Sequence, residues 1–312
     1  MDFKSLLSTI ATLFVLLITG VISNKCGIID DTSSKKLSKL IIAIGQPMLI
    51  INSLVKMEFS AENLKLGFIT LGIGIAVHGI MALISFFACK GFKDLDERKI
   101  TEFSMIFGNV GFIGFPILES LFGAKGLFMG SFFIISFNLV LWTWGIAILA
   151  RKRQDIKLTV KKVLVNYGTV PCLIGIILYC LNLNIPTFIT TSLSYLANLC
   201  TPISMLIIGA LLAKRTPKQI FASGKVYYLC AMKLLVMPLL LCLLMKLCGF
   251  SSEWILFIVA VVSMPSATTV TMLAELYDIS PGYSAQGVGT TSLLSIITMP
   301  CVLWLADFIV NL

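Results

Sequence analysis

The sequence predicts an all-helical integral membrane protein in which ten helices cross the bilayer. Of its 312 residues, 58% are hydrophobic and 12% are charged, a composition too apolar for a soluble globular domain. Ten apolar segments approach the roughly 20 residues that a helix needs to cross the hydrocarbon core. Two of these segments also carry residues that interrupt a helix near mid-span.

The ten expected spans are joined by short linkers, which leaves no room for a separate soluble domain. Their expected ranges are 5–23, 37–55, 66–89, 101–120, 126–150, 164–182, 189–213, 226–248, 254–276 and 284–310. We expect the first span to be retained, because the residues before it lack the basic region and small-residue cleavage site of a secretory signal. The nine cysteines show no paired spacing, so we expect small buried side chains and neither disulfides nor metal ligands.

Lysine and arginine residues are distributed unequally between alternate loops. Of the 24, 18 follow spans one, three, five and seven, five lie on the other side, and Lys233 lies within span eight. The positive-inside rule then predicts that the central basic linker, residues 151–163, is cytoplasmic and that both termini lie outside a plasma membrane. The linker separates two repeats of five spans, residues 1–150 and 164–312. Because five is odd, a two-fold repeat must be inverted.

Span two and span seven give partial evidence for that repeat. Both begin with Leu-Ser, and both place a proline, Pro47 or Pro202, near mid-span. The basic linker is interpreted mainly as a loop that sets topology, with binding of anionic lipid headgroups as the alternative.

Spans four and nine are the interrupted ones. Phe107–Leu121 reads FGNVGFIGFPILESL, and its glycines and Pro116 loosen or break a helix. Ser263–Leu276 repeats the pattern with Pro265 and a run of serine and threonine. Released carbonyl groups need partners in the bilayer, so we expect both segments to be broken, shielded by protein and lining a cavity. Two interrupted spans in corresponding halves indicate a binding site at the membrane midplane of a transporter.

Asn109 is the strongest polar candidate in this predicted site. Its amide offers two donors and an acceptor, and beside a broken helix it is suited to bind a carboxylate together with free backbone N–H groups. The alternative is that Asn109 satisfies carbonyls released by Pro116. The hydroxyl groups after Pro265 either hydrate the cavity or bond back to their own helix. The candidate substrate-binding residues are Asn109, Val110, Gly111, Pro116, Pro265, Ser266 and Thr268.

Ionisable residues inside the spans are candidates for coupling because a charge in the bilayer is costly. His78 lies near mid-span and is either a proton relay or, as the favoured interpretation, a hydrogen-bonded packing residue. Glu119 and Glu275 lie near the ends of spans four and nine and are the other candidates. Lys233 lies about two turns into span eight, where its side chain is able to snorkel to the interface.

The sequence shows no enzyme constellation, cofactor motif or metal-ligand set. It has a single histidine, and it contains no GxSxG, HExxH or phosphate-binding glycine loop in a strand–helix setting. The net charge of +9 does not indicate a nucleic-acid partner, because the basic residues lie in short loops between spans.

The chain resembles the auxin efflux carrier family, which includes bacterial permeases and the plant PIN-type carriers. The resemblance runs through nearly all of the chain. Its most specific residues are Asn109, Gly114, Pro116, Ile117 and Leu118 in span four and Pro265, Ala274, Glu275, Leu276 and Tyr277 in span nine. It departs from the plant carriers in lacking their long cytoplasmic loop and the acid–lysine pair of their span three.

The resemblance implies an inverted five-plus-five architecture like that of bile-acid symporters and sodium–proton antiporters. Spans four and nine would cross at Pro116 and Pro265, with Asn109 contacting the substrate carboxylate. Transport would be an elevator-type movement against a scaffold of spans one, two, six and seven, which would also form a homodimer. The expected substrates are auxin-like or malate- and malonate-like anions. The alternatives are a sodium-coupled carrier of the bile-acid type and, more remotely, a membrane receptor or scaffold that transports nothing.

Overall fold

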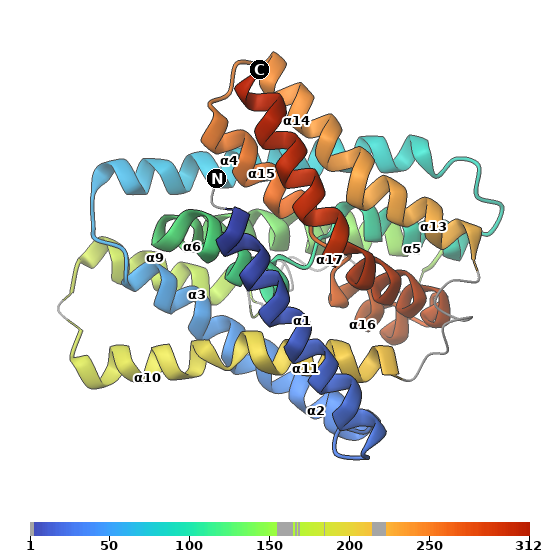
Figure 1. Ribbon diagram of the computed structural model, residues 1–312, viewed down its shortest axis with the longest axis horizontal. Helices are drawn as coiled ribbons and strands as arrows, with labels where there is room; N and C mark the ends of the chain where they lie inside the picture. The colour runs from blue at the N-terminus through green and yellow to red at the C-terminus, as the bar shows by residue number, and fades with distance from the viewer. Residues whose placement is uncertain (1–2, 155–164, 166, 168, 184, 214–222) are drawn as a thin grey trace.

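The computed structural model describes residues 3–154, 165, 167, 169–183, 185–213 and 223–312, and these ranges form helices and connecting loops (Figure 1). The first half contains α1 (Phe3–Lys25), α2 (Asp31–Leu40), η1 (Ile41–Gly45), α3 (Gln46–Val55), α4 (Ala61–Ala88), α5 (Leu95–Ile106), η2 (Val110–Gly114), α6 (Phe115–Val140), η3 (Leu141–Gly145) and α7 (Ile146–Ala150). The second half contains α9 (Thr169–Leu181), α10 (Thr187–Asn198), α11 (Cys200–Ala213), α13 (Gly224–Ala231), η4 (Met232–Val236), α14 (Met237–Leu247), α15 (Ser252–Val262), α16 (Thr268–Leu276) and α17 (Pro281–Asn311).

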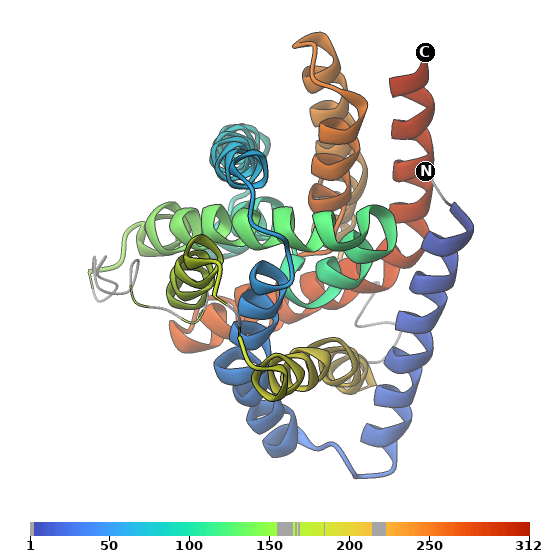
Figure 2. The same ribbon diagram turned by 90° about the vertical axis from the view of Figure 1, so that its left-hand side faces the viewer.

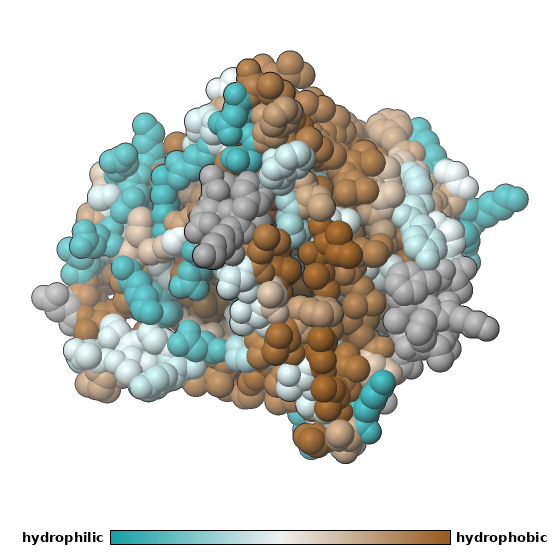
Figure 3. All heavy atoms as spheres, viewed as in Figure 1, coloured by the Kyte–Doolittle hydropathy of each residue, from teal (hydrophilic) through white to brown (hydrophobic). Residues whose placement is uncertain are grey.

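Seven helices of the described residues are long and apolar enough to cross a membrane. Figure 3 shows a broad band of hydrophobic residues across one face, between two sides where hydrophilic residues gather. The predicted class of all-helical membrane protein is therefore confirmed, whereas the ten-span inverted repeat stays a prediction. Two further apolar helices, α9 and α15, are shorter, with 13 and 11 residues.

The difference in number has local physical causes. The predicted span four, 101–120, is not one helix, because α5 ends at Ile106 and the chain continues in a non-helical conformation before η2. The stretch Val110–Ala150 is continuous over 41 residues, although Gly123 has φ 61° and ψ −147° and turns the chain inside it. The expected boundary between spans four and five lies at this glycine, since a positive φ is readily adopted only without a Cβ.

Several helices contain a π-helical turn just before a proline. Pro47, Pro116 and Pro238 each lie two residues after a π-helical turn, namely η1, η2 and η4. A proline lacks the N–H that would continue the hydrogen-bond ladder and its ring clashes with a carbonyl of the preceding turn. A wider turn before the proline relieves that clash and keeps the chain helical.

Two groups of helices pack mainly among themselves. One group contains α1, α2, α3, α9, α10 and α11, and the other contains α4, α5, α6 and α13 to α17. Within the first group α1 lies directly on α11, because a Cβ at Gly209 would stand 2.0 Å from the carbonyl oxygen of Leu17. Figure 2 shows α1 and α17 along the same side of the molecule, where the two groups meet.

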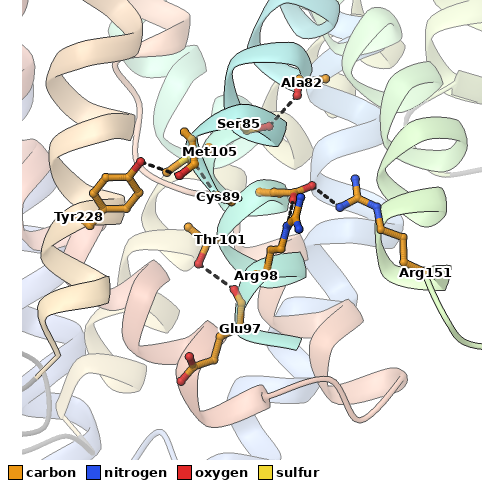
Figure 4. Close-up of polar contacts among 11 residues, drawn as sticks. Ala82, Ser85, Cys89, Glu97, Arg98, Thr101, Met105, Arg151 and Tyr228 are labelled. Atoms are coloured by element: carbon orange, nitrogen blue, oxygen red, sulfur yellow. Dashed lines mark hydrogen bonds and ion pairs between the residues drawn. The ribbon is translucent and has the colours of Figure 1, made fainter. Parts of the chain in front are cut away.

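A buried ion-pair cluster ties the end of α7 to α5 (Figure 4). Glu102 is 1% exposed, and its two carboxylate oxygens lie 2.8 Å from Nε of Arg98 and 2.6 Å from Nη1 of Arg151. The same helix is capped by Asp94, which accepts hydrogen bonds from the backbone of Asp96 and Glu97. Charged residues of α5 are thus partly built into the core.

Replacing Glu102 by glutamine is expected to lower the free energy of unfolding by about 2 kcal/mol. The substitution removes the carboxylate and leaves the charges of Arg98 and Arg151 uncompensated. Because both arginines are partly exposed, the loss of stability is smaller than for a fully buried ion pair. The matched control is Glu253→Gln, whose pair with Lys125 has 41% and 48% exposed side chains. In detergent, the midpoint of thermal unfolding should decrease clearly for Glu102→Gln and change little for Glu253→Gln. Equal decreases would contradict a special structural role for the buried cluster.

Candidate functional site

The two interrupted segments meet in the interior of the protein. The helix α5 ends at Ile106, and its C-cap residue Phe107 has φ −97° and ψ 109°. The helix α15 ends at Val262, with Ser263 as its C-cap residue. Gly108 and Ser266 then form an isolated antiparallel β-bridge. Its hydrogen bonds are 2.8 Å from the amide of Asn109 to the carbonyl of Pro265 and 2.9 Å from the amide of Ala267 to the carbonyl of Phe107. We call residues 107–109 and 263–267 the junction.

Neighbouring hydroxyl groups hold the junction in this conformation. The hydroxyl of Ser266 donates a 3.1 Å hydrogen bond to the carbonyl of Ser104 in α5. The backbone amide of Ser266 donates to the hydroxyl of Thr291 in α17, at 3.2 Å. Backbone groups released by the helix breaks therefore find partners inside the protein, as a non-helical segment at membrane depth requires. Ser266 is completely buried, and its position indicates a structural role.

The amide of Asn109 is the group at the junction that lacks a partner. Its side chain is 3% exposed, and Nδ2 has no hydrogen-bond partner among the described residues. A buried donor without an acceptor costs free energy, so the position indicates a site that an acceptor group of a ligand would complete.

Two helices begin directly after the junction. The π-helical turn η2, which continues into α6, starts at Val110 beside Asn109. The helix α16 starts at Thr268 beside Ala267. The first N–H groups of a helix have no partner within the helix, and its N-terminus carries a partial positive charge. An anion is therefore favoured where the N-termini of η2 and α16 meet the junction.

The candidate residues differ in how close they lie to the junction. Val110 and Pro265 are buried beside Asn109, whereas Gly111, Pro116 and Thr268 are half-buried on the helices that leave it. Glu119 and Glu275 lie on exposed surfaces of α6 and α16 and are not among the buried groups of the junction.

His78 is built into the packed interior of α4 and α6. Its Nδ1 lies 2.6 Å from the carbonyl oxygen of Gly74, and its ring packs against Phe107, Phe133 and Phe137. This environment matches the favoured interpretation, a hydrogen-bonded packing histidine. Its contact with Phe107 nevertheless places the ring next to the junction.

Lys233 corrects a prediction. The sequence places it where snorkelling to the interface is feasible, but the residue is 0% exposed. Its Nζ has no hydrogen-bond partner among the described residues. A Cβ at Gly108 would stand 3.3 Å from that nitrogen, so the lysine is directed inward to the junction. The sequence already marked Lys233 as a lone charge inside an apolar span, but not that its side chain turns inward.

Gln46 is a polar residue beside η2 that the sequence analysis did not include among the candidates. It begins α3 immediately before Pro47, and a Cβ at Gly111 would stand 2.8 Å from its Nε2. The absence of a side chain at Gly111 thus lets an amide from the other helix group approach η2. A polar residue beside the mid-span proline was the signal that would have identified it.

A small pocket lies between the two helix groups. Its volume is about 30 Å³, and it is lined by residues of α1, η2, α6, α11 and α17, including Ile113, Ile117, Met205, Ser292 and Ser295. A pocket of this volume is large enough to hold ordered water. Among the described residues there is also no cluster of three or more His, Cys, Asp or Glu residues suited to hold a metal ion.

Comparison with known proteins identifies the family. A family model described as Membrane transport protein matches residues 5–166 and 156–303. An uncharacterized transporter of Methanothermobacter thermautotrophicus is 23% identical over 97% of this chain and 99% of its own. One of Methanocaldococcus jannaschii is 24% identical over 96% of this chain and 98% of its own.

A shorter match carries a more specific name. A Rhizobium meliloti protein named "Putative malonate transporter" is 30% identical over 36% of this chain and 35% of its own. The two family-model matches together cover most of the sequence and agree with the resemblance to the auxin efflux carriers. The chain therefore belongs to the membrane transport protein family that includes the auxin efflux carriers.

Proposed function

We propose that this protein carries small organic acid anions across the plasma membrane and binds them at the junction. The observation that carries the proposal is the buried Nδ2 of Asn109, which lacks a partner and lies where two helices begin. A carboxylate supplies the missing acceptor and is favoured by both helix N-termini. The partial similarity to the protein named for malonate supports a malonate- or malate-like substrate, and the family supports auxin-like acids as well.

The packing of the helices supports an elevator-type mechanism. The junction belongs to the group formed by α4, α5, α6 and α13 to α17, which packs mainly with itself. The small pocket lies where that group meets α1 and α11. In the proposed mechanism the group that contains the junction moves against the other, which acts as the scaffold and as the surface for a homodimer. The basic linker faces the cytoplasm and the termini face outward, as the distribution of lysine and arginine predicts.

The simplest driving force for export is the membrane potential. Moving one elementary charge across about 100 mV is worth roughly 2.3 kcal/mol, which suffices to expel an anion from a negatively charged interior. Coupling to protons through His78, Glu119 or Glu275 is the competing proposal. The packed environment of His78 and the exposure of both glutamates favour transport without a coupled ion.

The proposal is tested by transport in proteoliposomes that contain the purified protein. Malonate, malate and indole-3-acetate are supplied in radiolabelled form in sodium-free buffer, at fixed pH, with an imposed potassium diffusion potential. We expect flux of at least one of these anions, which changes direction when the potential is inverted. Absence of flux for all three would contradict the proposed function, flux that is indifferent to the potential would contradict uncoupled transport, and flux that requires sodium would favour the sodium-coupled alternative.

A further inference from the structure

Lys233 is a buried lysine whose charge is not compensated by another side chain of the described residues. It lies in η4, is 0% exposed, and forms neither a hydrogen bond nor an ion pair in the described part of the chain. Lys99 is the informative contrast, because it is 1% exposed and its Nζ lies 3.0 Å from a carboxylate oxygen of Asp96. Burial of an unpaired ammonium group is costly and indicates a function.

The position of Lys233 relates it to two helix ends. Its Nζ and the carbonyl oxygen of Val261 each lie 3.3 Å from the point where a Cβ of Gly108 would stand. Both α5 and α15 end at the junction, and the C-terminus of a helix carries free carbonyl groups and a partial negative charge. The ammonium group therefore lies on the side of the junction where the helix C-termini would otherwise repel an anion.

Lys233 lies beside the residue that precedes Asn109 in the chain. Its Nζ is 3.3 Å from the position that a Cβ of Gly108 would take, and Asn109 follows with φ −81° and ψ 56°. Neither the Nδ2 of Asn109 nor the Nζ of Lys233 has a hydrogen-bond partner among the described residues. A ligand bound by the amide would therefore lie in the electrostatic field of the ammonium group.

We propose that Lys233 is a positioning residue that makes the junction selective for anions: its charge offsets the partial negative charge of the two helix C-termini, and it does not touch the ligand. This inference rests on the proposed function. Gly108 is part of the arrangement, because a larger residue at this position would displace the ammonium group from the junction. The lysine thus supplies the charge, while Asn109 and the helix N-termini supply the contacts.

The experiment compares each anion with its neutral amide. Malonate, malate and indole-3-acetate, and the corresponding amides, are titrated against purified wild-type protein and against Lys233→Met and Lys233→Arg by isothermal calorimetry. We expect Lys233→Met to reduce the ratio of anion affinity to amide affinity by about tenfold to a hundredfold, the size expected for one charge acting across a few ångströms of protein interior. Lys233→Arg should restore much of that ratio.

The control and the contrary outcomes separate this inference from the proposed function. Lys99→Met removes the other lysine that is fully buried among the described residues and is expected to leave the ratio unchanged, even if the variant is less stable. If the wild type binds none of the anions, the proposed function fails and this inference with it. If the wild type prefers an anion and Lys233→Met keeps the same ratio, or loses affinity for anion and amide equally, Lys233 is a structural residue and this inference alone is wrong.

Discussion

Replacing Asn109 by alanine is expected to abolish transport of organic anions and to leave the protein folded in the membrane. The side chain is buried and its Nδ2 makes no hydrogen bond within the described structure, so the folded state loses little when this donor is removed. A bound carboxylate would lose a hydrogen bond in a water-excluded site, which we expect to weaken binding by about 100-fold.

The matched control is Asn138→Ala. Asn138 is another buried amide of the same helix group, but its Nδ2 already donates a 2.9 Å hydrogen bond to the carbonyl of Ile134. We expect this variant to lose stability and to keep its affinity for the anion. The measurement is anion flux in proteoliposomes at equal protein incorporation, with thermal unfolding of both variants in detergent. Transport by Asn109→Ala at the wild-type rate would show that the site is elsewhere.

Replacing Gly209 by alanine is expected to cause the largest loss of stability among single substitutions in the first helix group. A Cβ at this position would stand 2.0 Å from the carbonyl oxygen of Leu17, and a Cβ at the facing Gly20 would stand 2.3 Å from that of Leu206. Backbone atoms cannot rotate away as a side chain does, so α1 and α11 would have to separate. Overpacking of this kind costs about 3 kcal/mol.

The control for Gly209→Ala is Gly72→Ala, because a Cβ at Gly72 in α4 would meet nothing within 4 Å. That substitution improves helix propensity without a collision, so its thermal midpoint should be unchanged or slightly higher than that of the wild type. Thermal unfolding of the purified variants in detergent is the measurement. Equal midpoints for Gly209→Ala and the wild type would mean that α1 and α11 do not pack as closely as described.

The features that the sequence predicted well have local causes. A proline and several glycines within an apolar segment interrupt a helix wherever that segment lies, which is why the break beside Asn109 follows from Phe107–Leu121 alone. The apolar composition likewise determined the membrane class without any knowledge of packing. The prediction that the two breaks lie close together came from their positions in corresponding halves of the sequence. Hydrogen bonds between residues far apart in the chain do join the two breaks.

The features that were missed depend on tertiary packing. A lysine two turns inside a span has the same local sequence whether its side chain extends to the interface or turns inward, and the packing of η4 near α5 places Lys233 inside. Gln46 became a candidate because Gly111 lets it approach a different helix. Apolar length alone also does not show where a helix is short or turned: the described residues hold seven long apolar helices, one of which contains the turn at Gly123.

The central claim, that the anion binds at the junction, is tested most directly by protection of a single thiol. In a background where the exposed Cys26, Cys180, Cys248 and Cys301 are replaced by serine, Thr268→Cys places a half-buried thiol at the start of α16. The rate of its modification by a methanethiosulfonate reagent is measured with and without the anion that is transported. The account predicts that this anion, and not its neutral amide, slows the modification at least several-fold. An unchanged rate at saturating anion would contradict the claim that the junction is the binding site.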